Sequence, residues 1–205
     1  MGFRKTCALT VWLVLVFQYV VLLKTGELGG FAVTTLTYFG YFTILTNILV
    51  ALAFSVSWLS PNSALARFFL KPNVRAAIAL YILVVAVVYY LFLAVEHNPT
   101  GLSYYLNICL HFIFPVLYVF DWLFLDTKKG LKYRTLPMWT VFPILYGVFN
   151  LVRGVITGFY PYPFLDISLI GAGGVMLNMV GFVALYYFGG AVFIWLGHRL
   201  TLRQA

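Results

Sequence analysis

Six long runs of apolar residues determine what this chain can fold into. They cover about residues 7–23, 33–59, 74–95, 102–125, 137–157 and 168–196. A helix of roughly 20 apolar residues is long enough to cross the hydrocarbon core of a bilayer. The composition agrees, because 63% of the residues are hydrophobic and 9% are charged, whereas soluble domains carry about 25% charged residues. We therefore expect an all-α, polytopic membrane protein with six transmembrane helices.

These runs leave no room for a separate soluble domain, so we expect one transmembrane domain over residues 1–205. The first run has the position of a signal peptide, but it is long and lacks a clear cleavage site of small residues. We interpret it as a retained first helix.

The charged residues predict how the helices are oriented. One set of connections is basic and carries Arg4 and Lys5, then Arg67, Lys71 and Arg75, then Lys128, Lys129, Lys132 and Arg134, then Arg199 and Arg203. The alternate connections carry Glu27, Glu96 and Asp166, with Lys24 as their one basic residue. Because basic loops stay on the cytoplasmic side, we expect both termini in the cytoplasm. The net charge of +8 therefore indicates orientation and contact with anionic headgroups, and no nucleic-acid partner is expected.

No pattern in the sequence indicates a metal or another cofactor. Cys7 and Cys109 lie inside apolar runs and predict neither a disulfide framework nor a zinc site. Bis-histidine haem ligation requires paired histidines in mid-membrane, and His97 and His198 lie at the edges of runs. The sequence also has no phosphate-binding loop, dinucleotide fingerprint or serine-hydrolase elbow. We expect no cofactor.

His111 is the one histidine that a membrane would bury in this arrangement. Ionisable side chains at that depth are costly and usually functional. With a rise of about 1.5 Å per residue, His111 lies roughly 15 Å below the outer end of the fourth run. The second run also enters from the outer side, near Val33, so Thr43 lies at a similar depth of roughly 15 Å. This match predicts that the Thr43 hydroxyl and the His111 imidazole face each other.

Further polar residues accompany this pair. Asn107 precedes His111 by four residues and Asn47 follows Thr43 by four, so the members of each pair share a helix face. Pro115 has no N–H to bond the carbonyl of His111, which predicts a kink or a free carbonyl there. A second polar stripe, on the fifth run, consists of Tyr146, Asn150 and Arg153.

One hydroxyl and one imidazole indicate nucleophilic catalysis on an ester. A neutral imidazole can take the proton of a hydroxyl and so activate it as a nucleophile. We predict acyl transfer to Thr43 with His111 as the base, followed by hydrolysis; Thr46, one turn away, is the competing nucleophile. The expected partners are a lipid or fatty-acyl ester and the bilayer, and the sequence does not indicate an oligomeric state. The candidate substrate-binding or oxyanion residues are Asn47, Asn107, Tyr146, Asn150 and Arg153, the last of these for a carboxylate.

The same residues also fit structural roles. Threonines in membrane helices bond to their own backbone, asparagines join helices to one another, and a midspan histidine can serve in packing. Arg153 has Asp166 and Glu96 as alternative partners, and Asp121 is expected to pair with a loop lysine. The alternative functions are therefore a non-catalytic lipid-binding protein and a small channel or transporter, although the two halves show no evident repeat.

Three short motifs, in this order and spacing, resemble a known family. They are Tyr41-Phe42-Thr43 with Asn47, Leu106-Asn107 with His111 and Pro115, and Tyr160-Pro161-Tyr162-Pro163-Phe164-Leu165. With the six runs, they are similar to the androgen-induced family of six-span membrane proteins, which includes threonine hydrolases of fatty-acid esters of hydroxy fatty acids. This resemblance implies that Thr43 is the nucleophile and His111 its base. Ile108 and Phe112 stand where those members carry a histidine and a threonine, and the chain resembles a bacterial-type branch, which implies a bacterial inner membrane.

Overall fold

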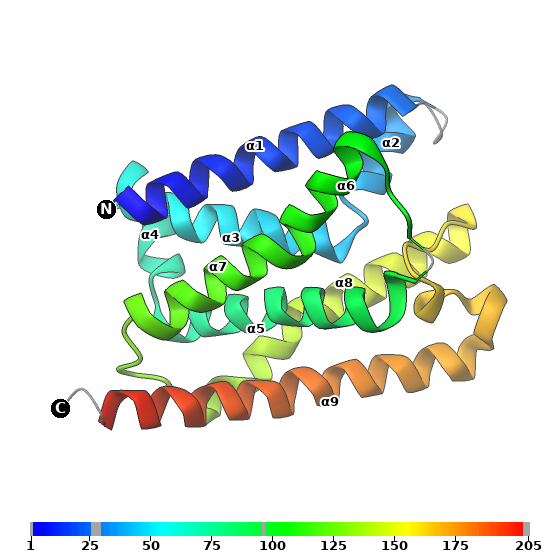
Figure 1. Ribbon diagram of the computed structural model, residues 1–205. Helices are drawn as coiled ribbons and strands as arrows, with labels where there is room; N and C mark the ends of the chain where they lie inside the picture. Colours follow the sequence, from blue (N-terminus) through cyan, green and yellow to red (C-terminus); the bar gives the residue numbers. More distant parts are fainter. Residues whose placement is uncertain (1, 26–29, 96, 203–205) are drawn as a thin grey trace. The chain divides into compact units, whose positions relative to one another are not determined.

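The computed structural model describes residues 2–25, 30–95 and 97–202, and within these ranges the chain forms helices and no strands (Figure 1). Six helical segments are long and apolar enough to cross a membrane: Gly2–Thr25, Phe42–Leu59, Pro72–Leu93, Gly101–Leu125, Tyr133–Thr157 and Ile167–Thr201. This confirms the predicted all-α fold with six transmembrane helices. Glu27, Glu96 and Arg203, which entered the orientation argument, lie outside the described residues.

The chain divides into two compact units, Met1–Gly130 and Leu131–Ala205. The first unit contains α1 (Gly2–Thr25), α2 (Phe31–Tyr38), α3 (Phe42–Leu59), α4 (Ala64–Phe69), α5 (Pro72–Val88), α6 (Gly101–Ile108) and α7 (Phe114–Phe120). Single π-helical turns continue these helices at Tyr89–Leu93, Cys109–Ile113 and Asp121–Leu125. The second unit contains α8 (Leu136–Thr157) and α9 (Ile167–Leu202), with 3-10 turns at Tyr133–Thr135 and Pro163–Leu165.

Small residues let the helices of the first unit pack closely. Helix α3 packs against α1 and α5, and α5 packs against α7. Ala51 and Ala53 on α3 and Ala76 and Ala79 on α5 are fully buried. Because lipid provides little hydrophobic drive for helices to associate, close backbone approach at such residues supplies the van der Waals contact that holds them together. Larger buried side chains fill the spaces between the helices: Val11, Phe54, Ile82, Phe114, Tyr118 and Trp122.

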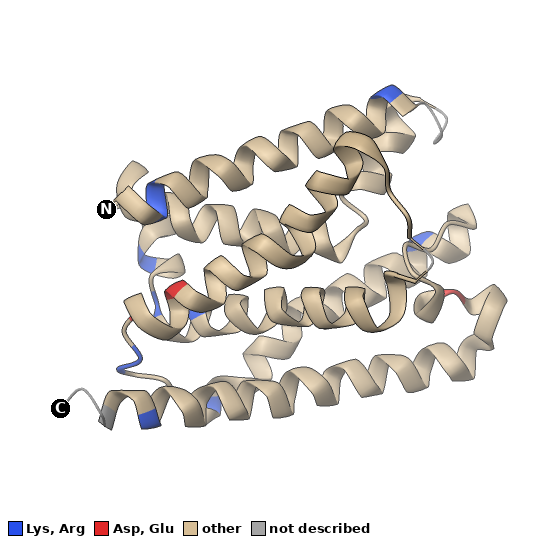
Figure 2. Cartoon of the chain, in the orientation of Figure 1, with Lys and Arg blue, Asp and Glu red and all other residues tan. Residues whose placement is uncertain are grey.

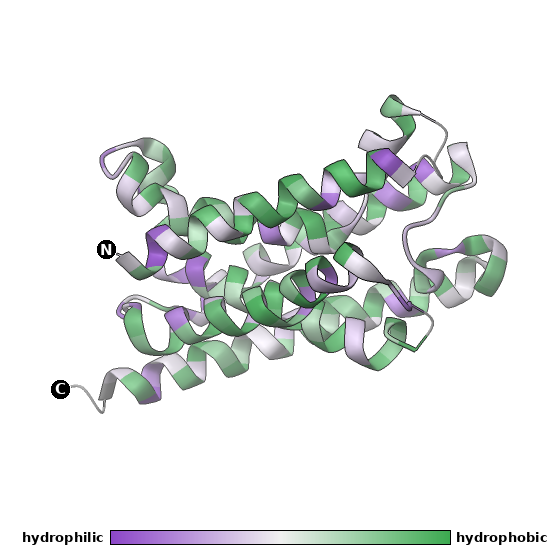
Figure 3. Ribbon diagram, turned by 45° about the horizontal axis from the view of Figure 1, so that its top comes forward, coloured by the Kyte–Doolittle hydropathy of each residue, from purple (hydrophilic) through white to green (hydrophobic). Residues whose placement is uncertain are grey.

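Apolar side chains also cover the outside of the long helices. Figure 3 shows hydrophobic residues along their middle stretches and hydrophilic residues mainly toward their ends. Leu91 and Phe92 in the first unit, and Leu177 and Phe188 in the second, are between 65% and 73% exposed. Soluble monomers rarely expose so much contiguous apolar surface. This surface fits lipid and supports an integral membrane protein.

The second span is not one continuous helix, contrary to the expectation of a single run from residue 33 to 59. Helix α2 ends at Tyr38, and α3 begins at Phe42 after an extended Tyr41. The Tyr38 hydroxyl donates to the Leu15 carbonyl of α1 at 2.7 Å, which ties the end of α2 to another helix. Gly40 in the break has a low intrinsic helix propensity. Thr43 therefore lies in the first turn of α3, and the premise of the depth estimate, one run of helix from Val33, was wrong.

Charged residues gather where α1 begins and α7 ends (Figure 2), and the side chains of Arg75, Asp121 and Asp126 are buried there. Asp121 is fully buried and accepts from Arg4 at 2.9 Å and from Arg75, while Asp126 also accepts from both arginines. The expected partner of Asp121, a loop lysine, was wrong, because the fork of a guanidinium can bridge two carboxylates and an ammonium cannot. Lys128 instead donates to two backbone carbonyls at 2.7 and 2.8 Å. Its burial lowers the pKa of the Lys128 ammonium, against the opposing effect of the carboxylates.

The second unit consists of α8 packed along α9. Gly154 on α8 lies against the ring of Tyr160, so a Cβ at this position would overlap the ring. Gly158 ends α8 with a φ of 72°, a left-handed conformation that glycine adopts without strain. Gly171, with a φ of 68°, interrupts α9 near its start. Glycines thus set the close approach and the ends of these helices.

Candidate functional site

The predicted threonine–histidine pair is in contact. Thr43 Oγ1 lies 3.2 Å from His111 Nε2. Thr43 belongs to the first turn of α3, and His111 belongs to the π-helical turn Cys109–Ile113 between α6 and α7. Both side chains are half-buried. The expectation that an alcohol of the second span reaches the midspan imidazole is confirmed, and the catalytic roles of the two residues stay predictions.

Pro115 accounts for the local shape of the chain at His111. It has no N–H to continue the α-helical bonding to the His111 carbonyl. The helix widens just before the proline, where the Phe114 N–H donates to the Cys109 carbonyl five residues back. Single π-helical turns of this kind are frequent at functional sites. The expected kink at Pro115 is thus a π-helical turn that contains His111.

The hydrogen bonds of His111 determine where its proton lies. Its Nδ1 is 3.0 Å from the Asn107 backbone carbonyl. A carbonyl oxygen can only accept, so Nδ1 carries the ring proton and donates it. In the neutral ring, Nε2 then has a free lone pair and accepts a hydrogen bond from the Thr43 hydroxyl. This tautomer is the one that a general base for Thr43 requires.

Asn47 connects the helices that carry the pair. Its Nδ2 donates to the Thr43 carbonyl at 2.8 Å and to the Leu110 carbonyl at 3.3 Å. Both amide protons are therefore used, and in this conformation Asn47 has no N–H left for an oxyanion. The residue is fully buried, and its Oδ1 has no hydrogen-bond partner among the described residues. Its evident contribution is to hold α3 against the turn that contains His111.

Tyr89 completes the surroundings of the imidazole, and sequence reasoning missed it. Its ring stacks on His111 with the ring centroids 3.9 Å apart and the planes 22° apart. Its hydroxyl accepts from Asn107 Nδ2 at 2.6 Å. Asn107 thus orients His111 through its carbonyl and Tyr89 through its amide. No local pattern distinguishes Tyr89 from the other tyrosines of the chain, because its role depends on packing between α5 and α6.

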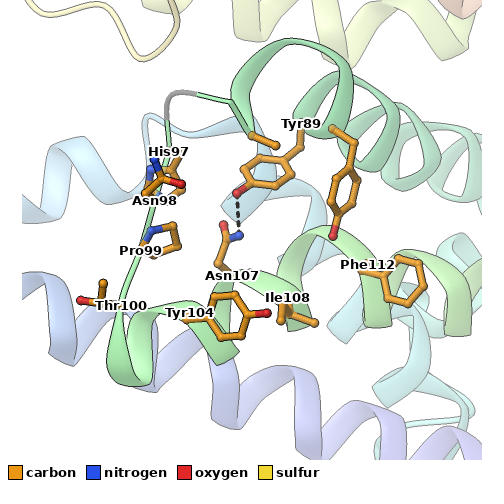
Figure 4. A pocket seen from close by; sticks show the side chains of 11 residues that line it. Tyr89, His97, Asn98, Pro99, Thr100, Tyr104, Asn107, Ile108 and Phe112 are labelled. Atoms are coloured by element: carbon orange, nitrogen blue, oxygen red, sulfur yellow. Dashed lines mark hydrogen bonds between the residues drawn. The ribbon is translucent and has the colours of Figure 1, made fainter.

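A pocket of about 730 Å³ lies directly beside these residues in the first unit (Figure 4). Tyr89 and Asn107 form part of its wall, and Figure 4 shows their polar groups pointing toward each other. Other lining residues are His97 from the connection before α6, Tyr104 from α6 and Phe112 from the π-helical turn after it. The volume is in the range typical of small-molecule sites, about 300–1,000 Å³. The pocket therefore adjoins the imidazole through two residues that contact it.

Thr46, the competing nucleophile, is placed differently from Thr43. It is fully buried, and its Oγ1 has no hydrogen-bond partner in the part of the chain that the structure describes. Thr43 is half-buried and in contact with His111. The geometry favours Thr43 over Thr46.

The three candidate residues of the fifth run lie on α8 in the second unit. Asn150 is fully buried, and its Nδ2 donates to the Tyr146 carbonyl at 3.0 Å. The Arg153 guanidinium lies 4.7 Å from the ring centre of Phe159. Asp166, which the sequence suggests as an alternative partner for Arg153, accepts a hydrogen bond of 2.8 Å from the Ser168 N–H at the start of α9. A role for these residues beside Thr43 and His111 stays a prediction.

In the ranges that the structure covers, no group of three or more His, Cys, Asp or Glu side chains is arranged to hold a metal ion.

The chain was also compared with known proteins. No family model, curated protein or solved structure matches it.

Proposed function

We propose that this protein is an intramembrane hydrolase of lipid esters, with Thr43 as the nucleophile and His111 as the general base. The observation that carries the proposal is the 3.2 Å contact between Thr43 Oγ1 and an Nε2 that must be an acceptor. A hydroxyl attacks an ester only when a base removes its proton, and an imidazole in this tautomer is suited to do so. The resemblance of the surrounding motifs to threonine hydrolases supports the same assignment.

The reaction then has two stages. Thr43 Oγ1 attacks the ester carbonyl while its proton passes to Nε2, and a tetrahedral oxyanion forms. The imidazolium returns that proton to the leaving alkoxide, which departs as an alcohol and leaves the acyl group on Thr43. Water then attacks the acyl-enzyme while Nε2 takes its proton, and the imidazolium returns that proton to Thr43 Oγ1 as the bond to the acyl group breaks and the fatty acid leaves. The second N–H of Asn107 and the hydroxyl proton of Tyr89 are side-chain donors beside the imidazole that suit the oxyanion.

The substrates that we propose are fatty-acid esters of hydroxy fatty acids or similar lipid esters. An adjoining pocket of about 730 Å³, with aromatic side chains such as Tyr90, Tyr104 and Phe112 in its lining, supports a substrate with an alkyl chain. The apolar outer surface of the helices supports delivery of that substrate through the bilayer.

A covalent probe tests the proposed nucleophile. A hydrophobic fluorophosphonate should label the purified protein at Thr43, and Thr43→Ala and His111→Ala should both abolish labelling. Thr46→Ala is the matched control and should keep it, because Thr46 Oγ1 does not contact His111. Unlabelled wild type, or labelling that survives Thr43→Ala, would refute the hydrolase and favour a non-catalytic lipid-binding protein.

We also propose that the protein lies in the inner membrane of a bacterium with both termini in the cytoplasm. The excess of Lys and Arg at alternate connections supports this orientation. Fusions of alkaline phosphatase, which is active outside the cytoplasm, should be inactive at either terminus and active in the connection before α6. The opposite pattern would reverse the orientation and leave the Thr43–His111 chemistry unaffected.

A further inference from the structure

His97 lies at the open end of the pocket beside His111. Figure 4 shows His97 and Asn98 on the connection at one end of the lining residues and Phe112, the residue after His111, at the other end. His97 is exposed, and its backbone N–H donates to the Leu93 carbonyl at 3.1 Å, which ties the connection to the end of the preceding helix. The pocket therefore extends from an exposed imidazole to the level of the His111 imidazole.

The two imidazoles are close enough for one lipid to reach both. The Tyr89 ring contacts each of them, with its centroid 6.2 Å from that of His97 and 3.9 Å from that of His111. These two distances add to about 10 Å, which is the largest separation that the two imidazole rings can have. An extended chain of single bonds advances roughly 1.2 Å per bond, so about eight bonds span this separation. A lipid with a second polar group about eight bonds from its ester can therefore place one group at each imidazole.

The open end of the pocket offers hydrogen-bond donors that suit an anion. An imidazole donates one N–H when it is neutral, and two when it is protonated and positively charged. The His97 ring contacts Tyr89, and neither of its nitrogens has a hydrogen-bond partner among the described residues. Asn98 and Thr100, from the same connection, add an amide and a hydroxyl. The described lining residues include no Asp or Glu that would repel an anion and no Lys or Arg, so His97 is the one side chain among them that can carry a positive charge.

A fatty-acid ester of a hydroxy fatty acid carries one free carboxylate. Arg153, which the sequence suggests for that carboxylate, lies on α8 in the second unit, where its guanidinium contacts the Phe159 ring. His97 lines the pocket itself, and a hydrogen bond to an ionised group is stronger than one between neutral groups. We propose that His97 binds the free carboxylate of the substrate at the open end of the pocket, and that the enzyme thereby selects esters that retain this carboxylate. The selection in cleavage rests on the proposed function, whereas the binding of a carboxylate lipid at His97 does not.

Two esters that differ only at this carboxylate test the proposal. The first is a palmitate ester of a hydroxystearic acid in which the ester-bearing carbon lies about eight bonds from the carboxyl carbon. The second is the same molecule with its carboxyl converted to a primary amide. At equal mole fractions in proteoliposomes, the wild-type KM for the acid should be about tenfold below that for the amide, because the amide lacks the charged acceptor. His97→Leu should raise the KM for the acid about tenfold, leave its kcat unchanged, and leave both constants for the amide unchanged.

Two further variants separate the carboxylate contact from other effects of the substitution. His97→Lys keeps a cationic donor at this position and should keep the preference for the acid. Arg153→Gln should also keep it, because Arg153 is not among the described residues that line the pocket. Unchanged cleavage of the amide shows that His97→Leu is folded. If His97→Leu raises the KM for the acid no more than the KM for the amide, or if Arg153→Gln abolishes the preference, the proposal is overturned.

A binding experiment separates the carboxylate contact from cleavage. In Thr43→Ala, a fatty acid that carries a photoreactive diazirine should label peptides of the pocket about tenfold more than the matching fatty amide, and adding His97→Leu should remove this difference. Ala94 lines the pocket, and Val95 beside it does not and is 83% exposed, so Ala94→Phe should reduce labelling and Val95→Phe should not. If wild type cleaves neither ester but labelling by the acid depends on His97, the hydrolase is refuted and the carboxylate assignment stands. Equal labelling by the acid and the amide overturns the carboxylate assignment whatever the activity.

Discussion

Replacing Arg75 with methionine tests the buried ionic cluster of the first unit, which consists of Arg4, Arg75, Asp121 and Asp126. The Arg75 side chain is 1% exposed and bridges Asp121 and Asp126, whose side chains are 0% and 8% exposed. It also donates to the Ala53 carbonyl at 3.2 Å. Methionine has a similar length and keeps most of the packing, but it leaves Arg4 as the one arginine beside the two carboxylates.

The expected loss of stability follows from the burial of these charged side chains. Removing one partner of a buried ion pair typically costs about 3–5 kcal/mol, because the remaining charge is left uncompensated. Arg4 is itself 23% exposed, so it compensates the carboxylates less completely than Arg75 does. We therefore expect Arg75→Met to lower the free energy of unfolding by about 3–5 kcal/mol. Arg75→Lys should lower the free energy of unfolding by a smaller amount, since one ammonium cannot bridge both carboxylates in the manner of a guanidinium.

The assay is equilibrium unfolding in mixed micelles with increasing denaturing detergent, followed by tryptophan fluorescence. Arg67→Met is the matched control, because Arg67 lies in the short helix α4 and donates an exposed hydrogen bond to the Asn62 carbonyl. Surface changes of this kind usually stay within about 0.5 kcal/mol. If Arg75→Met is no less stable than Arg67→Met, the inference that the buried cluster stabilises the first unit is refuted.

Three further predictions concern other parts of the molecule. Asn47→Leu should lower the free energy of unfolding by about 1–3 kcal/mol, because two backbone carbonyls lose their donor. Thr46→Val should lower it less, because the Thr46 hydroxyl has no partner among the residues that the structure describes. The same unfolding assay compares the two variants, and equal losses would argue against the Asn47 contacts. Gly154→Ala should lower the thermal unfolding temperature, because the new Cβ meets a tyrosine ring, and Gly181→Ala, with open space around it, should not. The folded pKa of Lys128 is lowered by burial, so the wild type should gain thermal stability relative to Lys128→Met as the pH rises toward the ordinary value of 10.5. A stability difference that is constant over this range would contradict the burial of its charge.

Sequence reasoning identified the Thr43–His111 pair, although part of that reasoning was wrong. The depth estimate assumed one helix from Val33, and the chain instead breaks between Tyr38 and Phe42. The contact forms because α3 starts beside the π-helical turn that holds His111. The premise of one continuous helix was wrong, whereas the residue chemistry and the resemblance of the motifs indicated the same pair.

The surroundings of the pair could not be predicted in the same way. Asn107 was expected to act through its side chain, but its backbone carbonyl is what holds His111 Nδ1. Tyr89 and the pocket depend on how α5 is rotated against α6, and no periodicity within one helix reports that rotation. Arg75 looked like a loop cation that orients the chain, and it is instead buried between two carboxylates.

By itself, the sequence determined the class of this protein and the number of its spans. The length and apolar character of each run are local properties, and a bilayer accepts such a run as a helix whatever its neighbours are. Only the tertiary structure decided which polar side chains meet. A contact such as Arg75 with Asp121, or Tyr89 with His111, depends on the rotation and breaks of helices that are distant in sequence, and these result from packing between helices.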